Sequence, residues 1–256
     1  MARGNHHWGR ILLVLALIVI VLLIAADRIG VVIAQKEVAK QAQAQLASED
    51  ITDSGTPDVT IHGFPFLTQV ASGNYGKITI DIPNPTSKGI QLEHLDVVAT
   101  DVNAPTSAVL SGDGQIKADR VSGTAQLDWQ TFQQMVDLSG LKQYGVDPTS
   151  LRINSAGPGK VSISAPAKIL GQSFTALATG SIAVANNVLH VKIDNISTAD
   201  STLPALVQQQ LQQLRNQLTF DVRIPELPYH LVLDSVSTNA AGVLISASAT
   251  NVVLGS

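Results

Sequence analysis

Apolar and polar residues alternate one by one through most of this chain, from about residue 58 to residue 254. Ile78, Ile80 and Ile82 show the pattern, and glycine, proline and asparagine separate many of the runs. Successive side chains of a strand point to opposite faces of a sheet, so each run predicts a strand with one apolar face. Such a sheet must close or curl around something apolar to hide that face. We therefore expect an α+β fold built on one long, strongly curved antiparallel sheet.

Two stretches interrupt the alternation with apolar residues at helical spacing. Residues 128–145 carry Phe132, Met135 and Val136 and contain glycines that would stop a helix. Residues 201–220 carry a stripe made of Leu203, Val207, Leu211, Leu214 and Leu218. Residues three and four apart share one side of a helix, so this stripe is expected to lie on the sheet. Residues 237–242 predict a hairpin that connects the last two strands.

The N-terminus holds sixteen consecutive apolar residues, from Ile11 to Ala26. As a helix they would span about 24 Å, against a bilayer hydrocarbon core of about 30 Å. The run is long for a signal peptide, and the best small-residue cleavage pattern lies well beyond it, so we favour an uncleaved anchor. Arg3 and Arg10 precede the run, and the positive-inside rule then keeps the N-terminus in the cytoplasm.

A second helical stripe follows the apolar run and predicts that the helix continues to about Ser48, as a stalk that becomes part of the domain. Asp27 and Arg28, between the two segments, are expected at the outer membrane surface. The expected organisation is a cytoplasmic N-terminus (1–10), a transmembrane anchor or uncleaved signal (11–28) and an exported domain (29–256).

Composition excludes several classes of function. The chain has no cysteine, which rules out disulfides, thiolate metal sites and a cysteine nucleophile. From residue 29 onward there are 13 Lys and Arg and 19 Asp and Glu, a net charge of 13 − 19 = −6. Such a surface disfavours nucleic acid as a partner.

No catalytic motif or metal-ligand spacing stands out. The sequence lacks a serine-hydrolase elbow, a phosphate-binding glycine loop and a zincin helix. None of the six histidines is expected to pair with another histidine or with a carboxylate at metal-ligand spacing, since Glu93 and His94 are adjacent and would point to opposite faces of a strand. We expect no cofactor, no metal and no enzyme activity.

Residues 61–83 are the most unusual part of the domain. They place Phe64, Phe66 and Tyr75 within twelve residues of a chain that is only 4% aromatic, and glycines and a proline surround these rings. In one interpretation the rings fill the core at a corner between strands. In the other, Phe66 and Leu67 line the entrance of an apolar cavity, because a curled sheet with a helix across it can leave space for long chains.

The motif Gly63 to Gln69 ("GFPFLTQ") and the closing stretch Thr250 to Leu254 ("TNVVL") resemble the LmeA family of actinobacterial phospholipid-binding proteins. The resemblance covers roughly residues 30 to 254. It implies an exported protein of the cell envelope with no catalytic residues. It also implies a fold like that of the tubular lipid-binding (TULIP) proteins, with the sheet wrapped around or packed on one or two long helices.

The resemblance and the apolar pattern together predict a protein that holds phospholipid acyl chains in an apolar groove and is anchored to the membrane by its N-terminal helix. The protein would then be a single-pass protein of the cell membrane with its C-terminal domain on the periplasmic side. The expected lipid-binding residues are Phe64, Phe66, Leu67, Tyr75, Leu203, Val207, Leu211 and Leu214. Two alternatives remain open: an envelope scaffold whose sheet is fully packed, and an envelope enzyme that acts on lipid or glycan.

Overall fold

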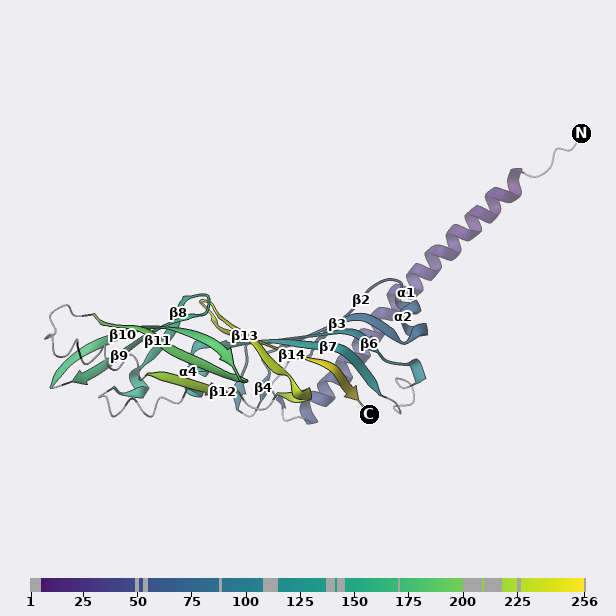
Figure 1. The fold of residues 1–256 in the computed structure, drawn as a ribbon. Helices are drawn as coiled ribbons and strands as arrows, with labels where there is room; N and C mark the ends of the chain where they lie inside the picture. Colours follow the sequence, from purple (N-terminus) through teal and green to yellow (C-terminus); the bar gives the residue numbers. More distant parts are fainter. Residues whose placement is uncertain are drawn as a thin grey trace, which may run out of the picture.

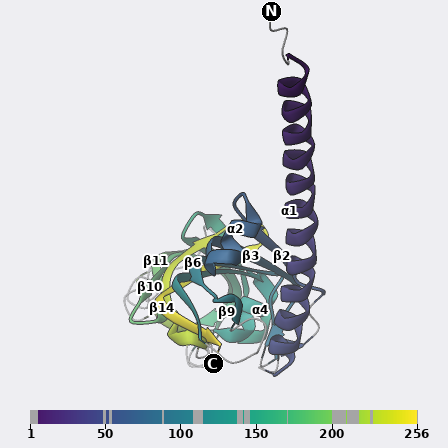
Figure 2. The ribbon, with the colours of Figure 1, turned by 90° about the vertical axis from the view of Figure 1, so that its right-hand side faces the viewer.

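The computed structural model describes residues 6–48, 51–52, 55–87, 89–107, 115–136, 141, 146–169, 171–199, 209, 218–224 and 227–255. The protein has an elongated body of antiparallel sheets, and one long helix projects from one end of it (Figure 1). Viewed along the body, the strands curve around an interior and the helix runs down one side (Figure 2).

The long helix, α1 (His6–Ser48), is continuous over 43 residues. It ends at the predicted residue, and it joins the predicted anchor and stalk into one element. The side chains of Val14 to Ala26 are all exposed, whereas one side of the helix is buried from Asp27 onward. The described part of α1 includes one stretch, Val14–Ala44, that is long and apolar enough to cross a membrane, a test that a signal sequence also passes.

The larger sheet has six strands in the order β13-β14-β7-β6-β3-β2, and every neighbouring pair is antiparallel. Its strands are β2 (Asp58–His62), β3 (Asn74–Pro83), β6 (His94–Asn103), β7 (Ile116–Asp128), β13 (Val232–Thr238) and β14 (Gly242–Gly255). Helix α2 (Phe66–Ser72) connects β2 to β3. The predicted hairpin is confirmed, because β13 pairs with β14 and the Asn239 N–H donates to the Gly242 carbonyl.

The second sheet has five strands in the order β12-β11-β10-β9-β8. They are β8 (Arg152–Gly157), β9 (Lys160–Ile169), β10 (Gln172–Ala185), β11 (Val188–Thr198) and β12 (Thr219–Arg223). A small third sheet joins β1 (Ile51–Thr52), β4 (Thr86–Ser87) and β5 (Ile90–Gln91). Two single 3-10 turns, η2 (Pro148–Ser150) and η3 (Pro228–His230), precede β8 and β13.

The α+β class and the antiparallel curvature are confirmed, but the expectation of one continuous sheet is wrong. The chain leaves the six-stranded sheet after β7, where the Asp128 carboxylate accepts from the Thr131 N–H at 2.7 Å and starts helix α4 (Trp129–Met135). It builds the second sheet and then returns as β13 and β14. Alternation identifies the apolar face of a strand and leaves its neighbours undetermined, so the division was not visible in the sequence.

One large core joins the two sheets. Phe132 of α4 is 1% exposed and belongs to the same cluster as Leu127 and Val243 of the six-stranded sheet and Val161 and Leu189 of the five-stranded sheet. The predicted helical segment at 128–145 is confirmed for Trp129–Met135, which form α4 at the junction of the sheets, and most of residues 137–145 lie outside the described residues. Of the second predicted helix, only Gln209 and the residues from Leu218 onward are described. Gln209 is helical, but the prediction is wrong at its end, because Leu218 is half-buried against the core outside any helix and Thr219 and Phe220 pair with β11 as part of β12.

Candidate functional site

The six-stranded sheet has one apolar face and one mostly polar face. On the apolar side, which we call the inner face, residues from neighbouring strands form three rows. Val59, Ile80, Val97, Gly123 and Ala247 form the first; Ile61, Ile78, Ala99, Val121 and Ala249 the second; Ile82, Leu95, Ala125, Ile245 and Val236 the third. The inner face is therefore a continuous apolar surface across the sheet.

The middle of the inner face is incompletely covered. The central strip, which we define as Ile80, Leu95, Val97, Gly123 and Ala125, is half-buried on three adjacent strands. Residues on both sides of it are buried, including Val59 at 4% exposure and Ile245 at 6%. The central strip is thus an apolar surface inside the body that still has access to solvent.

Small residues leave room over the central strip. Among the residues that the structure describes, a Cβ atom built on Gly123 would meet one atom outside its chain neighbours within 4 Å, the carbonyl oxygen of Asp96 at 3.8 Å. Ala125 lies two residues further along the same strand. Large side chains at these positions would fill the space that the glycine and the alanine leave open.

Helix α1 packs against the β2 edge of the inner face. Val31 of α1 lies in one buried cluster with Ile61 of β2 and Phe66 of α2, and Phe66 is 4% exposed. The ring of Tyr75 packs against this cluster, with its centroid 6.5 Å from that of Phe66. Burial raises the pKa of Tyr75 above its ordinary value of 10.0. Phe66 and Tyr75 therefore join the helix to the sheet.

Phe64 and Leu67 point outward at the corner between β2 and α2. Phe64 is 61% exposed and Leu67 is 42% exposed. Gly63, with φ of 103°, and Gly73, with φ of 67° at the end of α2, make the turns on the two sides of this short helix. The unusual stretch thus divides its apolar residues between a buried cluster and an exposed corner.

Asp27 attaches α1 to this corner. It is 2% exposed, and its carboxylate accepts from the Leu67 N–H at 2.8 Å and pairs with Arg28 at 2.7 Å. The Arg28 guanidinium also lies over the ring of Phe64, 4.9 Å from its centroid. The carboxylate of Asp27 is therefore buried under α2, whereas the expected position of Asp27 at the outer membrane surface stays a prediction.

Four of the sequence-predicted lipid-binding residues lie outside the described part of the chain: Leu203, Val207, Leu211 and Leu214. The residues of the central strip on β6 and β7 were not singled out by sequence reasoning. The available signal was the pair of small residues, Gly123 and Ala125, at alternate positions of an otherwise ordinary strand pattern.

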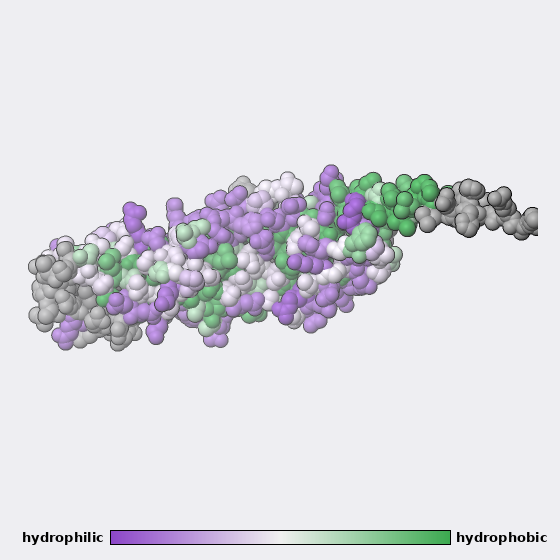
Figure 3. Space-filling view, turned by 90° about the horizontal axis from the view of Figure 1, so that it is seen from above, coloured by the Kyte–Doolittle hydropathy of each residue, from purple (hydrophilic) through white to green (hydrophobic). Residues whose placement is uncertain are grey.

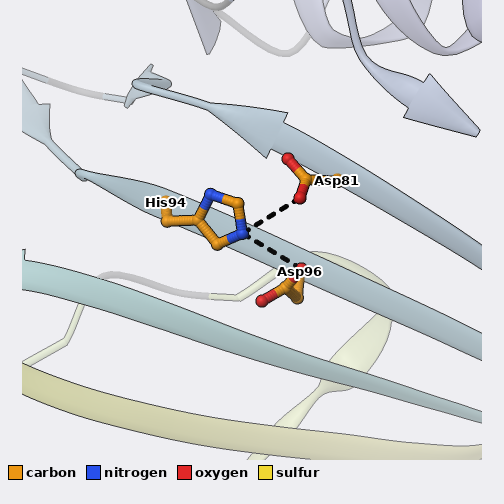
Figure 4. Close-up of side chains that lie close together, drawn as sticks. All are labelled: Asp81, His94 and Asp96. Atoms are coloured by element: carbon orange, nitrogen blue, oxygen red, sulfur yellow. Dashed lines mark ion pairs between the residues drawn. The ribbon is translucent and has the colours of Figure 1, made fainter.

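The outer face carries a cluster of charged side chains (Figure 4). His94 Nε2 lies 3.2 Å from Asp81 and 3.1 Å from Asp96. The prediction that no histidine pairs with a carboxylate at metal-ligand spacing is wrong here, because His94 and Asp96 are two apart on one strand and Asp81 is opposite Asp96 on the next. On the five-stranded sheet, His190 lies 2.7 Å from Asp221, a contact between neighbouring strands.

The geometry of Asp81, His94 and Asp96 would suit a cation, since one ligand atom from each lies within 4.8 Å of the others. The side chains are 39% to 49% exposed, and ion pairs at such exposure contribute little to stability. The cluster is on the opposite face of the sheet from the central strip. It therefore has no part in an apolar site on the inner face.

Two comparisons with known proteins bear on these surfaces. A search of curated proteins gives no significant match. The family model described as LmeA-like phospholipid-binding matches residues 25–248, which include the end of the apolar run, the five-stranded sheet, the six-stranded sheet except the end of β14, and the central strip. This family is a phospholipid-binding family and is not known as an enzyme family, which supports lipid binding by this chain. The chain belongs to the LmeA-like phospholipid-binding family.

Proposed function

We propose that this protein is a membrane-anchored phospholipid-binding protein that holds acyl chains against the central strip of its inner face. The observation that carries the proposal is that this strip is apolar, inside the body and only half-buried. Family membership supplies the ligand class. Phe66 and Tyr75 would support the wall of the site through α1, and the stripe from Leu203 to Leu214 would complete it.

Burial of the apolar acyl chain is all that this binding requires. Each methylene group removed from water contributes about 0.8 kcal/mol, so ten methylenes of an acyl chain on the strip would contribute about 8 kcal/mol. The strip offers no charged side chain, so the acyl chain would be recognised by its apolar surface and its length. We propose binding without chemical conversion, with no metal or cofactor.

The proposed location follows from α1. Its exposed apolar segment would cross the cell membrane once, with residues 1–10 in the cytoplasm and residues 29–256 on the periplasmic side. A lipid-binding body held at that surface would serve the assembly of envelope lipids or lipoglycans.

Photo-crosslinking tests the proposal. The full-length protein, in vesicles that contain a phospholipid with a photoreactive acyl chain, should form crosslinks at the central strip as well as along residues 14–26. The crosslinks along α1 report lipids around the anchor and serve as an internal reference.

A matched pair of variants sharpens this experiment. Gly123→Val should fill the strip and reduce its crosslinks several-fold, with those on α1 unchanged. The fold should be kept, because the new Cβ would lie 3.8 Å from its nearest neighbour. Ser122→Val, which places the same valine side chain on the outer face, should keep the crosslinks at the central strip. Crosslinks on α1 alone in the parent protein would reject the proposal and favour the scaffold alternative.

A further inference from the structure

A second exposed apolar surface lies where α1 leaves the body. On the outward side of the helix, Ile29, Val32 and Ile33 are 62%, 47% and 63% exposed. At the corner beside the helix, Phe64 and Leu67 are also exposed. We call these five residues the corner patch. In Figure 3 the part of the projecting helix next to the body is coloured mostly as hydrophobic, whereas most of the visible body surface is pale or hydrophilic.

Three contacts fix the level of the corner relative to the helix. The Leu67 N–H donates to Asp27, and the Arg28 guanidinium lies over the Phe64 ring. A Cβ atom built on Gly30 would lie 3.7 Å from the Leu67 side chain. Phe64 and Leu67 therefore lie beside residues 27–30 of α1.

The thickness of a bilayer places the membrane boundary at about the same position along α1 as the corner. From residue 11, a hydrocarbon core of about 30 Å corresponds to about 20 helical residues and ends near residue 31. Apart from Arg28, the exposed side of α1 stays apolar to Ile33. The first exposed charges beyond it are Lys36 and Glu37, which would lie clear of the hydrocarbon.

The charged residues at this level are suited to a membrane interface. The Asp27 carboxylate, costly to bury alone, has the Leu67 N–H and the Arg28 guanidinium as partners. The Arg28 side chain is 52% exposed, so it can also reach lipid phosphates at the interface. The Phe64 ring, which lies under the Arg28 guanidinium, makes a favourable cation–π contact at the level of the interface.

We propose that the corner at Phe64 and Leu67 inserts into the outer leaflet of the bilayer that α1 spans. The body then has two contacts with the membrane, the helix and the corner, and its end next to α2 is held in the headgroup region. The inference rests on the proposed anchoring and goes beyond it, since a helix could cross the membrane with the body standing free in solution.

The absence of cysteine makes a direct test possible. Phe64→Cys and Leu67→Cys, each labelled with an environment-sensitive fluorophore, would be studied in the full-length protein in phosphatidylcholine–phosphatidylglycerol vesicles. Spin-labelled lipids with the quencher near the headgroup should quench both probes several-fold more than a probe at Leu177→Cys. Leu177 is an exposed leucine on the five-stranded sheet and is the matched control.

A probe at Val19→Cys separates the proposed membrane anchor from the proposed insertion of the corner. If Val19 is quenched by deep spin labels but the corner probes behave like Leu177, the anchor stands and the insertion of the corner is rejected. If Val19 also escapes quenching, the chain does not span the bilayer and both are rejected. Lipid binding at the central strip is read out separately by the crosslinks there.

Discussion

The two large sheets arise from the same alternating pattern, but two regions of their apolar faces differ in how completely they are covered. In the five-stranded sheet, Val161 and Leu189 have no exposed surface, and Phe132 of α4 packs in the same cluster. In the six-stranded sheet, the corresponding face is half-buried at its centre, over Leu95 and Gly123. The core around Val161 and Leu189 is closed, whereas the central strip keeps an apolar surface available. The alternation that builds a sheet thus leaves open whether its inner face is filled by the protein.

The largest expected effect on stability comes from the substitution of leucine by aspartate, made at three positions that differ in burial. Leu189→Asp places a carboxylate in the closed core and should cost more than about 4 kcal/mol, which prevents folding. Leu95→Asp, on the central strip, should cost about 1 to 2 kcal/mol because water can reach the carboxylate, and should abolish lipid crosslinks at the strip. Leu177→Asp should stay within about 0.5 kcal/mol of the parent.

Urea denaturation of the full-length protein in detergent, followed by circular dichroism, measures these differences. If Leu95→Asp were as destabilising as Leu189→Asp, the central strip would be a solid core and the contrast between the sheets would be lost.

A smaller effect is expected at the joint between the sheets. Thr238 of β13 is 4% exposed, and its hydroxyl donates to the Gly157 carbonyl at 2.6 Å and accepts from the Lys160 N–H at 3.2 Å. Thr238→Val keeps the shape but leaves these groups without a partner, at a cost of about 1 to 3 kcal/mol. Thr238→Ser, which keeps the hydroxyl, is the control.

The shape of the unfolding transition gives the second readout for Thr238. Because one core joins both sheets, the urea transition of Thr238→Val should move to lower urea concentration as a single step. Two separate steps would show that the sheets unfold independently, with the six-stranded sheet as a unit of its own.

The smallest effect concerns the α1 side of the inner face. Burial raises the pKa of Tyr75, so its neutral form stabilises the folded state at pH values below its unfolded pKa, and this contribution is lost as pH rises through the folded pKa. Absorbance titration of tyrosinate should therefore lose a component above pH 10.0 in Tyr75→Phe. If the component lost in Tyr75→Phe instead titrated no higher than pH 10.0, Tyr75 would be open to water.

The sequence predicted the features that depend on near neighbours in the chain. The end of α1 at Ser48, helix α4 around Phe132 and the hairpin before Gly242 all follow from local spacing. The features it missed depend on distant partners. Asp27 is buried by a residue forty positions away, and His94 meets Asp81 only because β3 and β6 pair. Likewise, the split into two sheets depends on β14 pairing with β7 rather than with a nearer strand.

The continuity of α1 has a consequence for how the body is held at the membrane. The described helix runs without interruption from the segment proposed to span the bilayer into the wall of the body, and no flexible linker separates the two. If α1 spans the bilayer as proposed, the body cannot move away from the membrane, because its distance from the bilayer is set by a continuous helix. The five-stranded sheet, at the end of the body away from α1, is then the part that extends furthest from this attachment (Figure 1).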